Sequence, residues 1–516
     1  MTPTKTEHEA QVSMETAAIP LPDEPPFHIL LLGDYSGREN LSNFTNAALP
    51  EARPIEIDRD NFEHVLARLN TSLRLEFEGA DNGVLLLQFR ELDDFHPDQI
   101  FKQISLFSDL RDLRKRLLNP DTYESAAREV RIWFEETNDE PFEESKGQEP
   151  SDESSGESSG NLLDDILGDT KRDAEEYPTR STESPELNEF IRDIIRPHLI
   201  QTDEAEQAKL LAAIDQSTGE LMKRILHHPH FQALESAWRG LYFLVRRAET
   251  SNDLKLFLLD ITKDEITDNL KSVNDLSDSN IYRIVVKNTV RTPDADPWSV
   301  VCGNYTFELN VEDTATVIRL LKIASIANAP FISGAKPQML GIESLADTPS
   351  PADWNYKNET DEGKLWTMLR TVSEAPHLGL MTPRFLARLP YGKETEPLEA
   401  FDFEEFSDAP EHEKYLWANA SFACALLLAQ SYTASGWDMS QKLFHELDGL
   451  PVHLYKDETE TITKPCAEAQ LTENACEILL DQGLMPLISF RDTDRIRIAR
   501  FQSIAFPSKP LKGRWS

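Results

Sequence analysis

The sequence predicts an α/β protein in which a small α+β module precedes a larger, mixed α/β module. A continuous apolar run at residues 27–32, stopped by Gly33, is typical of a buried strand. Apolar residues then recur at every second position in 73–77 and 85–89, which predicts a half-buried hairpin. Beyond residue 254 strand-like and helix-like stretches alternate, as they do in α/β cores.

The small module is expected over residues 25–134. Residues 1–24 mix Thr, Glu, Pro and Ala without apolar periodicity, so they predict a flexible arm. The hairpin has Gly and Asn in its turn, and residues 97–118 follow it with apolar side chains spaced by three or four. We expect this stretch to form one helix that covers the sheet.

A strongly acidic segment separates the two modules. Residues 135–160 contain ten acidic residues and one lysine and end in a Ser/Gly tail, which predicts an extended linker. Residues 161–185 are expected to hold a short amphipathic helix followed by a polar linker. The apolar face of this helix would consist of Leu162, Leu163, Ile166 and Leu167.

The large module is expected over residues 186–505. Helices are predicted at 186–200, 205–216 and 219–227, and the clearest helix follows, with Phe231, Leu234, Trp238, Leu241 and Val245 on one face. Strands at 254–259, 298–302 and 330–333 alternate with helices such as 314–328, which predicts a mostly parallel or mixed sheet.

Three further stretches of the large module carry predictions. Residues 281–286 are ambiguous between strand and helix. Residues 416–432 predict a buried helix that ends near Gly436. Residues 506–516 look like a loose tail.

Composition narrows the function classes. The formal net charge is −39, from 91 acidic and 52 basic residues among 516, which disfavours nucleic acid and anionic membranes as partners. No apolar run approaches the roughly 20 residues that span a bilayer, and the first residues do not resemble a signal peptide. We therefore expect a cytoplasmic protein without membrane insertion, whose four scattered cysteines are reduced.

No cofactor, metal or catalytic constellation is predicted. His227, His228 and His230 surround Pro229 without a nearby carboxylate or cysteine, so this run predicts a junction between two helices rather than a metal site. A phosphate-binding loop of the Gly-x-x-x-x-Gly-Lys type is absent from the sequence, which excludes the usual nucleotide-driven motors.

The remaining charged candidates are Arg384, Arg388 and the doublet Glu404 and Glu405. We interpret them as buried or interfacial salt bridges, because paired guanidinium and carboxylate groups fix the geometry between elements. The alternative is a hydrolase or transferase whose site uses Arg384, Glu404 and Glu405 together with His377.

Five phrases in the second half of the chain carry a resemblance to a known family. In this order over residues 160–505 they resemble the large subunit of the type VI secretion contractile sheath, known as TssC. The phrases are LHHPHFQALESAWRGLYFLV from Leu226, APFISGAKP from Ala329, TPRFLARLPYG from Thr382, FDFEE from Phe401 and YLWAN from Tyr415.

A second resemblance lies upstream, where three phrases are similar to the small sheath subunit, TssB. They are PFHILLLGDYSG from Pro26, IEIDRDNF from Ile55 and LDDFHPD from Leu92. The two resemblances together imply a fused, phage-tail-like structural protein that acts by packing against other sheath subunits or itself. Structural or interface contacts are expected from Trp238, Arg239, Arg384, Arg388, Glu404, Glu405 and Trp417.

The resemblance also implies a second partner. Large sheath subunits carry a short N-terminal helix that the AAA+ unfoldase of the system recognises, and Leu162–Leu167 is the matching candidate here, with an ordinary packing helix as the alternative. Large subunits also continue past the equivalent of Phe506 with a further domain, whereas this sequence stops at Ser516. We therefore expect a component that caps, regulates or joins a sheath, with a self-assembling divergent sheath subunit as the alternative.

Overall fold

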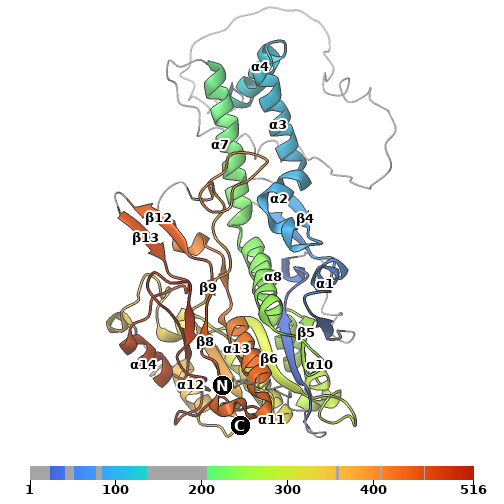
Figure 1. Cartoon of the computed structure of the whole chain (residues 1–516), viewed down its shortest axis with the longest axis vertical. Helices are drawn as coiled ribbons and strands as arrows, with labels where there is room; N and C mark the ends of the chain where they lie inside the picture. Colours follow the sequence, from blue (N-terminus) through green and yellow to red (C-terminus); the bar gives the residue numbers. More distant parts are fainter. Residues whose placement is uncertain are drawn as a thin grey trace, which may run out of the picture. The chain divides into compact units, whose positions relative to one another are not determined.

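The fold is built around a nine-stranded sheet (Figure 1). The computed structural model describes residues 24–40, 52–76, 84–135, 206–355, 359–406, 410–457 and 460–516. In spatial order the strands of this sheet are β11 (Glu446–Leu447), β15 (Ile496–Ile498), β14 (Met485–Ser489), β8 (Leu378–Thr382), β7 (Phe331–Ala335), β6 (Trp298–Phe307), β1 (Phe27–Gly33), β5 (Leu254–Asp260) and β2 (Ile55–Ile57).

The centre of this sheet is parallel and its edges are antiparallel. Strands β14, β8, β7, β6, β1 and β5 are parallel to one another, whereas β2 runs antiparallel to β5, and β15 runs antiparallel to both β14 and β11. The expectation of a mostly parallel or mixed sheet in an α/β protein is therefore confirmed.

Strand β1 is the only central strand that comes from the first 200 residues, among those described, and it is fully buried. It pairs with β5 on one side, from Phe27 opposite Leu254 to Gly33 opposite Asp260, and with β6 on the other. A continuous apolar run suits this place, because a parallel strand inside a sheet is covered on both faces. The predicted strand at 27–32 is confirmed, but it belongs to the same sheet as the strands after residue 254.

Three smaller sheets have two strands each. They are β9 (Phe385–Leu386) with β10 (Trp417–Ala418), β12 (His453–Asp457) with β13 (Glu460–Lys464), and β3 (Ser72–Glu76) with β4 (Val84–Gln88). The third pair confirms the predicted hairpin.

The described residues also form helices. The longer ones are α1 (Phe62–Arg68), α2 (Pro97–Gln103), α3 (Ser105–Leu118), α4 (Tyr123–Glu135), α7 (Glu206–Leu226), α8 (Pro229–Arg247), α9 (Lys263–Lys271), α11 (Val311–Ala327), α12 (Asp361–Arg370), α13 (Ala420–Ser435) and α14 (Glu473–Asp481). Shorter helical segments are α10 (Asn280–Tyr282), the π-helix η6 (Arg283–Lys287), and the 3₁₀ turns η1 (Arg38–Asn40), η3 (Leu92–Phe95), η5 (Leu276–Asp278), η7 (Pro337–Leu340), η8 (Pro351–Asp353), η9 (Ala375–His377), η10 (His412–Lys414) and η11 (Gly436–Gln441).

The described residues divide into two compact units. The first comprises residues up to 75, 86–103 and 223–516, and it contains the nine-stranded sheet. The second comprises 76–85 and 104–222, and α3 and α4 pack together in it through the apolar stripe of α3. Within this second unit the guanidinium of Arg114 donates to both carboxylate oxygens of Asp215, at 2.6 and 3.1 Å.

Helix α13 packs on one face of the large sheet and α11 on the other. The Phe27 ring of β1 stacks on Tyr432 of α13 at 4.7 Å between ring centres. Leu30 and Leu32 of the same strand share a buried cluster with Leu320 of α11. Alternate side chains of a strand point to opposite faces, so β1 joins both layers of the core.

Several predicted boundaries are confirmed and some are wrong. The helical alternative at 281–286 is confirmed, and the helix predicted at 416–432 begins only at Ala420, because Trp417 and Ala418 pair with β9. The helices predicted at 205–216 and 219–227 are one helix, α7. The hydroxyls of Ser217 and Thr218 donate to the carbonyls of Ala213 and Ile214, which keeps both residues helical.

Two more predictions need correction. The single helix expected over 97–118 is broken at Ile104, whose extended backbone (φ −98°, ψ 117°) separates α2 from α3. The loose tail expected at 506–516 is tied down beyond Phe506. Leu511 and Trp515 are buried, and the Leu511 and Lys512 amides donate to the carbonyls of Phe501 and Pro376.

The helix α8 depends on a close approach that only glycine permits. A Cβ atom on Gly240 would lie 2.5 Å from a ring carbon of Phe422 in α13, closer than side-chain carbons approach. Helix α8 therefore lies closer to α13 here than any larger residue allows.

We expect Gly240→Ala to lower the stability of the protein by about 1 to 3 kcal/mol, because the added methyl overpacks this contact. Helix propensity alone would predict the opposite sign, a gain of about 1 kcal/mol. Thermal unfolding of the variant, with the exposed Ala233→Gly of the same helix as the propensity control, decides between the two. A stabilised Gly240→Ala protein would contradict the packing argument.

Candidate functional site

A cluster of buried charges joins α8 to the chain between Arg388 and Glu405. The Arg388 guanidinium donates to Glu235 (Nε to Oε1, 2.9 Å) and to both oxygens of Glu405, at 2.8 and 3.2 Å. The side chains of all three residues are at most 6% exposed. One cation thus bridges two anions inside the protein.

A second arginine, Arg239, gives this cluster as many positive as negative charges. Arg239, one helical turn after Glu235, donates to Glu235 at 2.7 Å and to the hydroxyl of Tyr391 at 2.9 Å. The Tyr391 amide donates to Glu405 at 2.8 Å, and the Arg388 guanidinium lies 4.2 Å from the centre of the Tyr391 ring. We call Glu235, Arg239, Arg388, Tyr391 and Glu405 the buried charge network; it holds two positive and two negative charges.

His227 lies in the turn between α7 and α8 and also contacts the network. Its Nε2 lies 3.3 Å from a carboxylate oxygen of Glu405. The predicted junction of two helices at this histidine run is confirmed, since α7 ends at Leu226 and α8 begins at Pro229. A proline in the first turn of a helix suits that position, because its missing N–H would have no helical partner there.

The electrostatics of the network keep its groups ionised. Burial alone would raise the pKa of Glu405, but Arg388 and the hydrogen bond from His227 outweigh it and lower the pKa to about 2. Burial likewise opposes the charge of Arg388, and the carboxylates of Glu235 and Glu405 raise its pKa well above the ordinary value. A carboxylate of this kind is a poor proton donor or acceptor near neutral pH, so the network suits positioning rather than acid–base chemistry.

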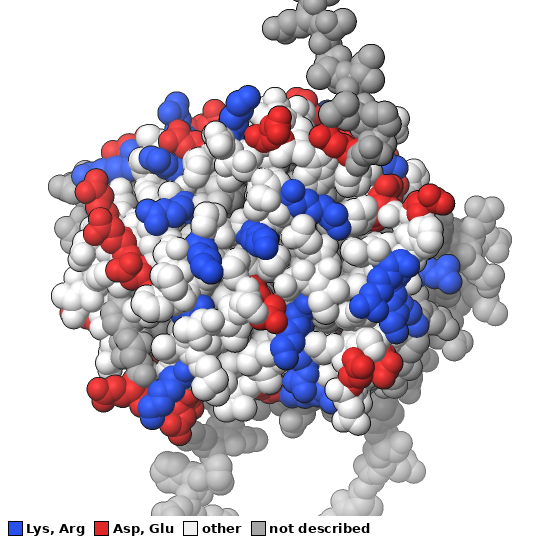
Figure 2. All heavy atoms as spheres, turned by 90° about the horizontal axis from the view of Figure 1, so that it is seen from below, with Lys and Arg blue, Asp and Glu red and all other residues white. Residues whose placement is uncertain are grey.

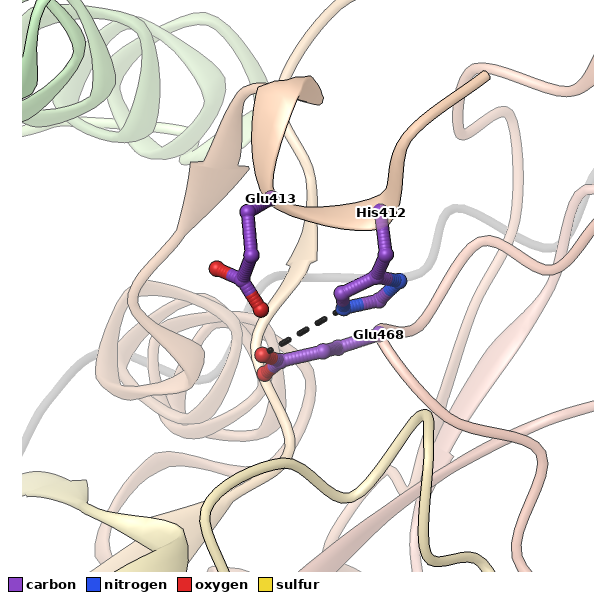
Figure 3. Close-up of side chains that lie close together, drawn as sticks. All are labelled: His412, Glu413 and Glu468. Atoms are coloured by element: carbon purple, nitrogen blue, oxygen red, sulfur yellow. Dashed lines mark ion pairs between the residues drawn. The ribbon is translucent and has the colours of Figure 1, made fainter. Parts of the chain in front are cut away.

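A second cluster gathers around Glu468 (Figure 3). The Nη2 and Nε atoms of Arg384 donate to its two oxygens at 2.5 and 3.1 Å, and the Arg384 amide donates as well, at 3.1 Å. His412 Nε2 lies 3.6 Å from the same carboxylate, and Glu413 lies 3.7 Å from Arg384. Burial would raise the pKa of Glu468, but His412 and Arg384 hold it far below its usual range.

The ligand atoms of His412, Glu413 and Glu468 lie within 4.8 Å of one another, which is close enough for a metal ion. The Arg384 guanidinium, however, already binds Glu468 and approaches Glu413, and the Lys464 ammonium lies 3.0 Å from His412 Nδ1. The Arg384 guanidinium therefore already neutralises the carboxylates that a metal ion would need, and Lys464 adds a second cation at the other ring nitrogen, so the donor set does not fit a metal ion.

The predicted site residues fall into separate places. Arg388 and Glu405 lie together, whereas Arg384 pairs with Glu468, and Glu404 accepts a hydrogen bond from the Lys393 amide at 3.1 Å. His377 Nδ1 lies 3.3 Å from the carbonyl oxygen of Glu374. The four residues of the hydrolase or transferase alternative thus each contact a different partner.

The two predicted tryptophans anchor neighbouring elements through their indole N–H groups. Trp238 donates to the carbonyl of Tyr35 at 2.8 Å, which joins α8 to the segment after β1, and Trp417 donates to the carbonyl of His412 at 3.0 Å. The segment with Leu162, Leu163, Ile166 and Leu167 lies outside the described residues.

Sequence reasoning did not identify Glu235, Tyr391 or Glu468. One signal for Glu235 was present, because it occupies the apolar stripe of α8 between Phe231 and Trp238, where an unpaired charge would be costly. A charged residue in that position calls for a buried partner. Nothing in the sequence near Glu468 indicates that it faces Arg384.

In both clusters the charges that fix the geometry are paired inside the protein. Residues 208–505, more than half of the chain, match the family described as EvpB/VC_A0108, tail sheath N-terminal domain, so the chain belongs to this sheath family. Residues 14–137 match the family described as type VI secretion system, VipA, VC_A0107 or Hcp2. The two resemblances to sheath subunits, fused in one chain, are confirmed.

A curated relative is similar to the second region. The type VI secretion system sheath protein TssC1 of Pseudomonas aeruginosa is 33% identical over 306 residues, which cover 58% of this chain and 61% of the relative. The chain thus spans about three fifths of the length of that relative. Among the described residues, helices with the length and apolar character needed to cross a bilayer are absent.

We expect Glu405→Gln to destabilise the protein by about 3 kcal/mol or more at neutral pH, because it removes one partner of a buried ion pair and leaves Arg388 partly unpaired. The variant should also change how the stability of the protein depends on pH. The pKa of Glu405 is lowered on folding, so its stabilising effect is complete above pH 4.5 and is lost as the pH falls towards about 2.

Thermal unfolding of both proteins between pH 7 and pH 2.5 measures this effect, and the difference between them should shrink below pH 4.5. The control is Glu404→Gln, which alters the exposed neighbour and should leave the curve close to wild type. A constant difference across this pH range would contradict the assignment.

Proposed function

We propose that this chain is a structural subunit of a type VI secretion contractile sheath that acts through protein packing and catalyses no reaction of its own. The observation that carries the proposal is the place of β1. This strand lies within the region that matches VipA, and both of its neighbours, β5 and β6, lie within the region that matches the tail sheath family. The two sheath regions share one sheet.

The shared sheet supports a fixed one-to-one ratio of the two regions. A covalent connection makes their pairing intramolecular, with an effective concentration in the ~mM range for a flexible tether. The pairing then does not depend on the supply of a separate small subunit. The Glu405 and Arg388 side chains support the absence of a reaction, because each is bound by protein groups on several sides.

Within the sheath, we propose that the chain caps, regulates or joins assemblies of other sheath subunits. The outermost strands of the nine-stranded sheet are short, three residues in β2 and two in β11. Short edge strands offer few free backbone groups to an added strand, so they disfavour growth by sheet extension. This feature supports a component that ends or connects an assembly over one that propagates it.

Electron microscopy tests this role. We expect the purified chain to form discrete particles, and to bind the ends of tubes or shorten them when it is mixed with separate small and large sheath subunits. Tubes formed by the chain alone would refute capping and would establish the self-assembling alternative. A mixture in which the chain neither binds nor alters the tubes would refute the sheath role.

We further propose that the AAA+ unfoldase of the secretion system recognises the segment from Leu162 to Leu167. Its leucine-rich face, flanked by aspartates, suits binding in an apolar groove. We expect the double substitution Leu163→Asp and Ile166→Asp to abolish retention of the unfoldase in a pull-down with the full chain. The matched control, Asp164→Asn with Asp165→Asn, leaves the apolar face unchanged and should retain binding, whereas binding by the double aspartate variant would refute the assignment.

A further inference from the structure

An open groove of about 720 Å³ lies on the sheet-bearing unit, beside α10 and the second half of α11. Its apolar lining comes from Leu276, Tyr282 and Ile326, and its charged lining is two cations, Arg291 and Lys322, and two anions, Asp275 and Glu374. Ile326 is 46% exposed, which is unusual for a residue of its size. The groove therefore combines apolar surface with charge.

Basic side chains surround this groove. The Arg291 guanidinium lies 5.5 Å from the centre of the Tyr282 ring, and the Lys287 ammonium lies 5.9 Å from it. Lys512 is close as well, because its amide donates to the carbonyl of Pro376, two residues after Glu374, at 2.7 Å. The guanidinium of Arg514 donates to the carbonyl of Ala327, next to Ile326, at 3.1 Å.

We call Lys287, Arg291, Lys322, Lys512 and Arg514 the basic face. Among the described residues, none of these five has a carboxylate oxygen within 4 Å, and the first four are exposed. Figure 2, which views the molecule from the end where α11 and the C-terminus lie, shows Lys and Arg spread over the middle of a face. Two carboxylates of the groove, Asp275 and Glu374, interact electrostatically with Lys287 and Lys322, so the five cations still leave a net positive charge that suits an external anion.

The anion with the best complementarity is a carboxylate-rich peptide. Nucleic acid also offers negative charge, but it carries a phosphate at every nucleotide, a denser negative charge than a face of five cations can balance. A peptide can instead place a few carboxylates beside the cations and an apolar side chain beside Tyr282 and Ile326. The sequence itself contains such a peptide, since residues 135–160 carry ten carboxylates and one lysine, with Phe142 between Glu140 and Glu143.

We infer that the basic face binds the acidic segment 135–160 of this chain, with Phe142 supplying the apolar contact to the groove. The contact does not depend on whether the chain caps or builds a sheath. Exposed charges attract each other over a Debye length of about 8 Å at physiological salt, so the affinity should fall as salt is added.

A synthetic peptide with the sequence of residues 135–160 and a fluorescein label tests the inference by fluorescence anisotropy. The receptor is the full chain with the ten acidic residues of its own segment changed to Gln or Asn, so that this segment does not compete. We expect saturable binding at 50 mM salt that weakens at least about tenfold at 300 mM. The substitutions Arg291→Glu with Lys322→Glu should weaken it by a similar factor.

Three controls make the test specific. Lys364→Glu reverses an exposed cation on α12 that already pairs with Asp361, so it should leave binding unchanged. Lys512→Glu alone should weaken binding and serves as the second variant if the double variant does not fold. A peptide with Phe142→Ser should bind several-fold less tightly than the original.

Absence of peptide binding, or an equal loss with Lys364→Glu, would overturn the inference. Tighter binding of a ten-nucleotide single-stranded DNA than of the peptide would overturn it as well, in favour of a phosphate-binding face. Because the readout is peptide affinity rather than tube formation, its failure is distinct from failure of the proposed sheath role.

Discussion

The rest of the structure depends on the insertion of β1 between β5 and β6. Without this strand, β5 would keep only its antiparallel partner β2, and β6 would present an unpaired parallel edge. Unpaired backbone groups inside a protein are costly, so both halves of the sheet need β1. The same seven residues contact α13 through Phe27 and the cluster with α11 through Leu30, which makes the strand part of both core layers.

The buried charge network has a different role from this apolar packing. Placing four charges inside a protein costs much of the free energy that their attraction returns, so such a network contributes little net stability compared with apolar side chains of the same size. Its geometry is demanding, however, because Arg388 must reach Glu235 of α8 and Glu405 at the same time. We interpret the network as a device that selects one arrangement of α8 against the segment between residues 388 and 405, with Arg384 and Glu468 acting in the same way nearby.

Much of the local structure could be predicted from the sequence, whereas the long-range contacts could not. The strands at β1 and β5 and the helix α8 follow from apolar periodicity, which is a property of neighbouring residues. The partner of Arg388 on α8 is 153 positions away, so no local pattern predicts it. The packing of the C-terminal residues against the core also depends on a long-range contact. Trp515 is buried near Phe27, which is distant in sequence, so the local pattern wrongly predicted a loose tail.

The distance along the chain between β1 and β5 explains what a fused chain gains. Phe27 pairs with Leu254, and closing so long a loop costs entropy, but this cost grows only with the logarithm of loop length, by about 0.6 kcal/mol for each doubling. A separate small subunit at micromolar concentration would instead face a thousandfold lower effective concentration than a tethered one in the ~mM range, which corresponds to about 4 kcal/mol. The effective concentration of a tethered partner already includes the entropy of closing the connection, so tethering leaves a net advantage and makes formation of the central sheet independent of protein concentration.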